Sequence, residues 1–170
     1  MTETCNDIDD NCDGVVDNGA FGDAFESNST CGTERVINPV GSDQGQSYSS
    51  MTLYPQSDAD YYRIHAAETD SICACGAFSF DEDYEFRVTL TVPLSAGSYE
   101  VCLDATGCSA FATCLTVAGG GAGTVSLFLD GGCTATDAYD LYVRVRGIGS
   151  PGFECQPYGL TYFFDAGLCR

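Results

Sequence analysis

The chain has 170 residues, enough for one ordinary domain with a short extension, and it carries 25 Asp and Glu against six Lys and Arg, a formal net charge of -19. This charge disfavours nucleic acid and anionic membranes as partners and favours cations. Eleven cysteines indicate disulfide bonds and an extracellular or cell-surface location, and their odd number leaves at least one outside an intramolecular pair. No run of about 18 apolar residues predicts a membrane span.

Residues 1–23 form an acidic appendage that is too poor in apolar side chains to build a core. The segment CNDIDDNCDGVVDNG, from Cys5 to Gly19, reproduces the first nine positions of an EF-type loop, with Gly14 at the sharp turn. Hard oxygen donors at this spacing favour calcium over zinc or copper. The expected ligands are Asp7, Asp9, Asn11, Asp13, the Val15 carbonyl and Asp17.

The twelfth position of this loop is Ala20, where the full pattern has a bidentate Glu, so the ligand shell is incomplete. Asp7, Asp23, an acid from the following domain, or water would complete it. The alternative is a solvated acidic tail that matches the pattern by chance.

The same segment resembles the cysteine-bracketed metal-binding motif of bacterial surface proteins, and more loosely the calcium loops of thrombospondin type 3 repeats and dockerins. Cys5 and Cys12 stand where that motif places its cysteine pair. The resemblance implies that these two cysteines form a small disulfide.

Residues 24–56 are expected to be a linker and first strand region. Asn28-Ser29-Thr30 within it is an N-glycosylation acceptor if the host modifies it, which would mark an exposed loop. The alternative is an ordinary polar linker.

Residues 57–170 contain short runs rich in Val, Leu, Tyr, Phe and Thr, separated by Gly, Ser, Asp and Pro, which predict an all-β domain. In YDLYVRVR, alternation places Tyr139, Leu141, Val143 and Val145 on one face. No long amphipathic helix is predicted. The expected strands are 60–66, 85–92, 97–104, 112–117, 123–129, 139–146 and 159–164.

Two acidic groups lie near the predicted strand ends and are candidates for a second metal site, with solvated turn residues as the alternative. The candidate residues are Asp58, Asp60, Asp81 and Asp83. Five disulfides are expected in total. Cys102 and Cys108 are expected to pair because a short, turn-containing segment separates them.

The phrases SDADYYRI, SYEVCLD, DAYDLYVRVRG and PYGLTYFF, between Ser57 and Phe164, resemble the bacterial pre-peptidase C-terminal domain. That family implies an antiparallel, jelly-roll-like β-sandwich, commonly attached to secreted peptidases. This chain departs from it in its many cysteines, and no peptidase is expected within these 170 residues. The predicted fold is therefore an all-β, jelly-roll-like sandwich with a disulfide-stapled, calcium-binding N-terminal loop.

We expect no enzyme, because the single histidine, His65, lies in a predicted strand and no nucleophile elbow or zinc-protease motif is present. The leading hypothesis is a calcium-binding structural protein of the cell exterior, a surface or filament subunit that self-associates head to tail. A polysaccharide- or cell-surface-binding module, and an accessory domain of a secreted hydrolase, are the alternatives. The candidate sugar-binding tyrosines are Tyr48, Tyr54, Tyr61, Tyr62 and Tyr158.

In the head-to-tail hypothesis, the N-terminal segment of one subunit docks on the sandwich of the next, which supplies the missing ligand. The alternative is that this segment folds back on its own sandwich through a disulfide such as one from Cys31.

Overall fold

The computed structural model describes Glu3 and residues 8–14, 22–54, 58–69, 81–94, 96–132, 137–149 and 154–168. These residues form an all-β protein, and no helix long and apolar enough to cross a membrane occurs among them. The strands are β1 (Arg35–Val40), β2 (Gln44–Leu53), β3 (Ala59–Ala67), β4 (Asp81–Thr91), β5 (Ser98–Asp104), β6 (Thr113–Ala118), β7 (Ala122–Gly132), β8 (Ala138–Ile148) and β9 (Glu154–Leu168).

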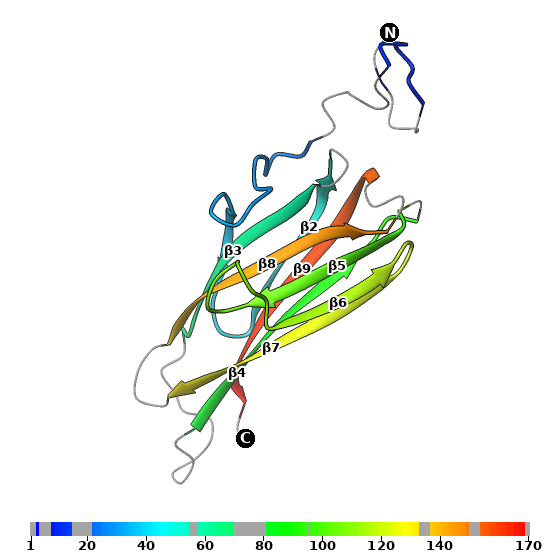
Figure 1. Ribbon diagram of the computed structural model, residues 1–170. Helices are drawn as coiled ribbons and strands as arrows, with labels where there is room; N and C mark the ends of the chain where they lie inside the picture. Colours follow the sequence, from blue (N-terminus) through cyan, green and yellow to red (C-terminus); the bar gives the residue numbers. More distant parts are fainter. Residues whose placement is uncertain are drawn as a thin grey trace.

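The strands pack as two sheets face to face, which makes the predicted β-sandwich (Figure 1). One sheet has the order β1-β3-β8-β5-β6 and the other the order β2-β9-β4-β7. Every pairing is antiparallel except that of β1 with β3. In Figure 1 the five-stranded sheet faces the viewer, with β8 and β5 at its middle.

The seven strands predicted from alternation correspond to β3 through β9. Strands β1 and β2 were not identified individually, although both come from the segment expected as linker and first strand region. Their sequences, RVINPV and QGQSYSSMTL, are polar and include Pro39, and both strands lie at sheet edges. Edge strands tolerate proline and polar residues because one side of the backbone has no partner strand.

The core lies between the two inner faces, and the period-two alternation of the strands fills it. On β8, Leu141, Val143 and Val145 are fully buried, as predicted. Asp140 and Arg146, which flank this run in sequence and point to the other face, are exposed. Tyrosine is unusually frequent among the buried side chains. The fully or almost fully buried tyrosines are Tyr62, Tyr84, Tyr99, Tyr158 and Tyr162.

Two disulfides join described residues, Cys31–Cys108 and Cys102–Cys114. The predicted Cys102–Cys108 pair is wrong, because Cys102 on β5 lies directly opposite Cys114 on β6 in the strand register. Cys108, in the loop between these strands, bonds Cys31 instead.

The expected staple between Cys5 and Cys12 is not formed in this structure. Cys12 is a free, exposed cysteine, and Cys5 lies outside the described residues. Cys31 bonds Cys108 and so attaches the segment just before β1 to its own sandwich, but residues 8–14 extend beyond the sandwich and do not fold back on it (Figure 1).

Candidate metal centre

Residues 22–34, here called the strap, run beside β3 and are fastened to the sandwich at several points (Figure 1). The Phe25 ring packs edge-on against Tyr48 and Tyr62, with centroid separations of 5.5 and 6.1 Å. The Asn28 carbonyl accepts a hydrogen bond from the Tyr61 amide at 2.9 Å. Together with the Cys31–Cys108 disulfide, these contacts hold the strap against the first residues of β3.

The Asp23 carboxylate adds a further attachment between the strap and β2. Its Oδ1 accepts a hydrogen bond from the Phe25 amide and its Oδ2 one from the Thr52 amide, each at 2.7 Å. The Asp23 side chain therefore helps to shape the strap while its charge lies near the other acids of this region.

Asp60 enters the protein interior because it is the second residue of β3. Alternation along this strand gives it the same face as Tyr62 and Ile64, and its side chain is fully buried. Asp58, just before the strand, is 8% exposed. Two carboxylates at this depth need partners, since buried charges are costly when unpaired.

Glu26 of the strap meets these two aspartates. One carboxylate oxygen from each of Glu26, Asp58 and Asp60 lies within 4.8 Å of the other two. The Glu26 and Asp58 carboxyl groups face one another closely enough to share a hydrogen bond when one of them is protonated. With both ionised, the buried oxygens Glu26 Oε1, Asp58 Oδ2 and Asp60 Oδ1 have no hydrogen-bond donor among the described residues, and the same is true of Asn28 Oδ1 in the strap. Buried polar atoms are normally satisfied, so this set requires an explanation such as an ion.

The remaining oxygens of the cluster are held by the protein. The Ala59 amide donates to Asp58 Oδ1 at 2.8 Å, and the Ser29 hydroxyl also donates to the Asp58 carboxylate. The Tyr158 hydroxyl donates to Asp60 Oδ2 at 2.5 Å, so the Tyr62 hydroxyl, 2.8 Å away, donates to Tyr158. These bonds orient the two aspartates and leave one oxygen of each for another ligand.

Burial and mutual repulsion make the cluster resist ionisation. Desolvation raises the pKa of Asp60 to about 8, and the Asp58 and Asp23 charges add to the effect. Desolvation, followed by the charges of Asp58 and Asp23, raises the pKa of Glu26 to about 7. The pKa of Asp58 is also raised, mainly by burial.

The residues fit a calcium ion. Calcium takes six to eight oxygen ligands at about 2.3–2.6 Å, so oxygens on opposite sides of one ion are about 5 Å apart. One oxygen of each of the three carboxylates lies within 4.8 Å of the other two, so a single ion between them can contact all three. A divalent cation would also remove the repulsion that raises the pKa values of Glu26 and Asp60.

The pH dependence of stability provides a first prediction. In the cation-free protein, Asp60 stays protonated up to about pH 8, whereas in the unfolded chain it ionises near its ordinary pKa of 3.8. The folded state therefore binds more protons over this interval, and its stability falls as pH rises, with the contribution of Asp60 complete below about pH 4 and lost above about pH 8.

We expect the thermal midpoint of chelator-treated protein to fall between pH 5 and pH 8.5 by more than that of the Asp60→Asn variant. Calorimetric scans of both proteins at each pH would measure this. The general charge repulsion of a highly acidic chain lowers both thermal midpoints alike, so it cancels when the two proteins are compared. Equal slopes for the two proteins would contradict the burial of an ionisable Asp60.

Of the predicted N-terminal calcium ligands, Asp7, Val15 and Asp17 lie outside the described residues. Asp9 accepts hydrogen bonds from the amides of Asp13 and Gly14 at 3.2 and 2.8 Å, and Asn11 Oδ1 accepts one from the Asp13 amide at 2.8 Å. Gly14 has a φ of 91°, as a sharp turn at this position requires. The loop thus has a turn of the expected kind, and its calcium binding stays a prediction.

The second predicted site does not come together as a set of four. Asp58 and Asp60 lie at the start of β3, whereas Tyr84, next to Asp83, hydrogen-bonds Glu68 just after the end of β3. Asp83 is therefore at the other end of the sandwich, as is the backbone of Asp81, whose side chain is outside the described residues. Glu26 takes their place, which sequence reasoning missed because no motif connects the strap with β3.

The expectation that Asn28 marks an exposed loop is wrong, because its side chain is fully buried. Its backbone N–H donates to the Glu26 carboxylate, and its carbonyl accepts from the Tyr61 amide. In the folded protein the Asn28 amide therefore faces the interior and is closed to a glycan.

Two of the five candidate sugar-binding tyrosines, Tyr62 and Tyr158, are core residues that support Asp60 instead of forming a platform. His65 lies exposed on the outer face of β3, where its Nδ1 is 3.1 Å from Asp140. This is a hydrogen bond between two exposed side chains.

Fold and site together define a disulfide-bonded β-sandwich with a buried carboxylate cluster at one end. No family model and no curated protein matches the chain. Among solved structures, the pre-peptidase C-terminal domain of a collagenase from Bacillus anthracis is 11% identical, with a TM-score of 0.36 over 78% of this chain and 96% of that one. A chain of broad bean stain virus is 11% identical, with a TM-score of 0.30 over 54% and 62%. Likenesses at this level assign neither a family nor a function.

Proposed function

We propose that this protein is an extracellular, calcium-binding structural protein without catalytic activity, in which disulfides and a bound ion hold the strap against the sandwich. One observation carries the proposal: Glu26, Asp58 and Asp60 bring buried carboxylate oxygens together, and in their ionised form these oxygens have no donor among the described residues. Asn28 is the candidate for an additional oxygen ligand. The N-terminal loop with Asp9, Asn11 and Asp13 is the candidate for a second ion.

The extracellular location is supported by the two disulfides, since such bonds persist in oxidising compartments. The strap explains why an ion would serve a structural role. It contributes Glu26 to the cluster, while the sandwich contributes Asp58 and Asp60, so an ion at this place joins two segments that are distant in sequence.

The proposal predicts that calcium raises the thermal midpoint of the chelated protein, because a ligand that binds only the folded state stabilises it. At a hundredfold excess over Kd the gain is about 2.7 kcal/mol, or roughly 5–10 °C for a chain of this size. Differential scanning calorimetry with calcium, and with magnesium as the control, would measure it. An unchanged midpoint at millimolar calcium would count against the proposal.

The proposed structural role includes self-association as a surface or filament subunit. Light scattering and electron microscopy of concentrated protein with calcium would test this part separately. A strictly monomeric protein under these conditions would limit the proposal to calcium binding.

A further inference from the structure

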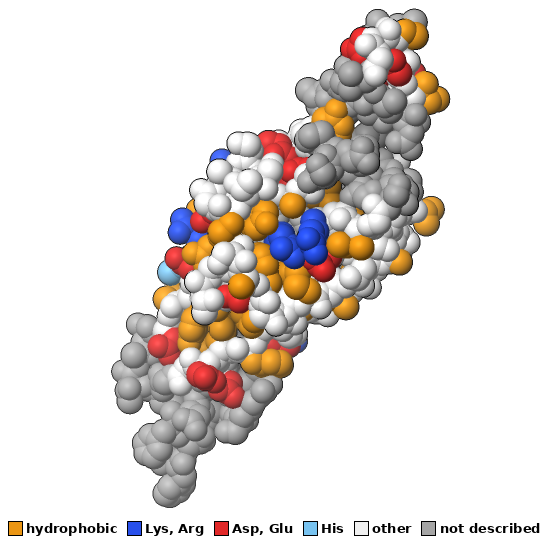
Figure 2. Space-filling view, in the orientation of Figure 1, with side chains coloured by type: hydrophobic (Ala, Val, Ile, Leu, Met, Phe, Trp, Pro, Cys, Tyr) orange, Lys and Arg blue, Asp and Glu red, His pale blue; other side chains and the backbone are white. Residues whose placement is uncertain are grey.

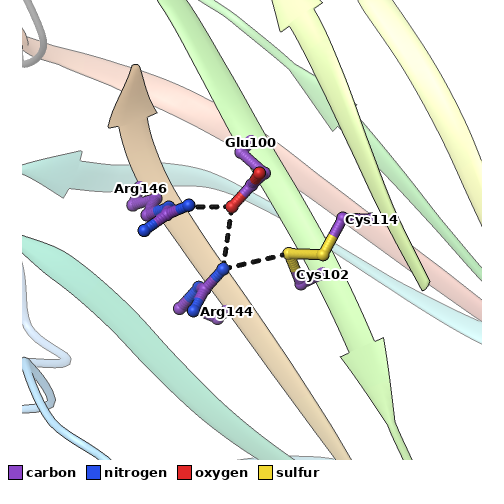
Figure 3. The surroundings of a disulfide bond; sticks show 5 residues. All are labelled: Glu100, Cys102, Cys114, Arg144 and Arg146. Carbon is purple, nitrogen blue, oxygen red and sulfur yellow. Dashed lines mark hydrogen bonds and ion pairs between the residues drawn. A yellow bond between two sulfur atoms is a disulfide. The ribbon is translucent and has the colours of Figure 1, made fainter. Parts of the chain in front are cut away.

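The outer face of the five-stranded sheet carries a disulfide in an unusual electrostatic setting (Figure 3). Cys102 on β5 is opposite Cys114 on β6 and, on its other side, opposite Arg144 on β8. Cys102 is fully buried, while Cys114 is exposed. The two sulfur atoms of this bond thus differ in their accessibility to an incoming thiol.

The Arg144 guanidinium contacts the buried sulfur directly. Its Nη2 lies 3.2 Å from Cys102 Sγ and 2.8 Å from Glu100 Oε1, and the Phe111 ring covers it with the centroid 4.7 Å from Cζ. Arg146 donates to the same Glu100 oxygen at 2.7 Å. A Glu100 carboxylate oxygen also lies within 4.8 Å of both sulfur atoms, and both guanidinium groups bind this carboxylate. Arg144 is the group that contacts the buried sulfur.

This setting determines how the disulfide would react. In thiol–disulfide exchange, the incoming sulfur attacks the accessible sulfur, and the bond breaks faster when the leaving thiolate is stabilised. The exposed Cys114 sulfur is the one that an incoming thiol can attack. The leaving thiolate would then form at Cys102, whose sulfur is already in contact with the partly shielded Arg144 guanidinium. A neighbouring arginine is a recognised means of stabilising a thiolate.

The chain also contains a free thiol, which this exchange requires. Cys12 is free and exposed, and it is surrounded in sequence by Asp9, Asp10 and Asp13. Figure 2 shows a patch of basic side chains over β8 and β5, bordered by hydrophobic ones, on a protein of net charge -19. When no ion is bound to it, the acidic Cys12 loop therefore complements the surface on which Cys114 lies. Figure 1 places residues 8–14 beyond the end of the sandwich, away from β6 of the same chain.

We propose that the Cys102–Cys114 disulfide is a thiol-exchange site at which Cys12 of a second copy attacks Cys114 and links the two chains covalently. The Cys102–Cys114 S–S bond breaks, a Cys12–Cys114 S–S bond forms, and Cys102 leaves as a thiolate beside Arg144. The proton of the Cys12 thiol passes to solvent. One disulfide replaces another, so the step consumes neither oxidant nor reductant. The inference rests on the proposed self-association and specifies its contact.

The test is to incubate concentrated wild-type protein and to analyse it by non-reducing electrophoresis and peptide mapping. We expect disulfide-linked oligomers with a Cys12–Cys114 peptide and a free Cys102. Cys12→Ser should form none, and Arg144→Gln should form them about tenfold more slowly, since its leaving thiolate lacks the adjacent charge. Arg63→Gln is the matched control, because Arg63 lies on the same outer face but pairs with Asp140 and not with Glu100; its rate should stay close to wild type.

Linked oligomers that persist in Cys12→Ser, a Cys12 peptide joined to another cysteine, or the absence of linked species in wild-type protein would overturn the inference. Light scattering of protein whose Cys12 has been alkylated distinguishes a failure of the thiol-exchange inference from a failure of the proposed self-association. Non-covalent association would persist there if the proposed function holds, while calcium stabilisation is measured independently. Incubating Cys12→Ser with glutathione should place glutathione on Cys114 and leave Cys102 free; modification of Cys102 instead would also contradict the inference.

Discussion

Replacing Asp60 by asparagine should abolish most of the calcium-dependent stabilisation and, in the absence of calcium, should make the protein more stable at pH 8.5. The two effects have one cause. Asp60 is fully buried and its pKa is raised to about 8, so in the cation-free protein its ionised form is penalised. Asparagine keeps an oxygen that can accept the Tyr158 hydrogen bond but carries no charge to hold a cation.

The size of the gain without calcium follows from the difference between a pKa near 8 in the folded chain and 3.8 in the unfolded one. At about 1.4 kcal/mol per pKa unit, this difference corresponds to at most about 6 kcal/mol at high pH. Urea unfolding with and without calcium would measure both effects. Asp140→Asn is the control, since Asp140 is an exposed carboxylate on the outer face. An Asp60→Asn protein that calcium stabilises as much as wild type would exclude the site.

Removing the Cys31–Cys108 disulfide should destabilise the protein and also weaken calcium binding. Its cysteines are 77 residues apart, for which chain entropy gives about 4 kcal/mol, or a fall of roughly 10 °C in thermal midpoint. Calcium binding should weaken because this bond holds the strap that carries Glu26. A double Cys31→Ser, Cys108→Ser variant, followed by calorimetry and calcium titration, would measure the two losses.

The Cys102–Cys114 disulfide offers a matched comparison, because it joins two strands that are already paired and its cysteines are only 12 residues apart. The same entropy estimate gives about 3 kcal/mol for its removal. Calcium affinity should be retained in that variant, since neither cysteine belongs to the strap. Equal loss of calcium affinity in both double variants would show that the strap has no special part in the site.

The sequence predicted the sandwich well where burial imposes a strict alternation. The face assignment on β8 was correct because Leu141, Val143 and Val145 must all enter the core while the residues between them remain outside. Prediction failed for the polar edge strands β1 and β2, whose side chains are only partly buried and leave a weak pattern.

The candidate site was predicted only in half. Asp58 and Asp60 were identified from their position before a strand, but their depth in the protein depends on which face of β3 enters the core. Glu26 joins the cluster from the strap, whose Phe25 packs on Tyr48 and Tyr62, a tertiary contact with no local signature. The cysteine pairing failed for a similar reason, since strand register, not separation in sequence, places Cys102 opposite Cys114.

A crystal structure of the protein grown with calcium tests the central claim most directly. We expect an ion between the strap and the start of β3, bound at about 2.3–2.6 Å by oxygens of Glu26, Asp58 and Asp60. Its identity would be confirmed by the anomalous signal of calcium at long wavelength. Carboxylates that remain without an ion at saturating calcium, with only hydrogen bonds between protonated side chains, would contradict it.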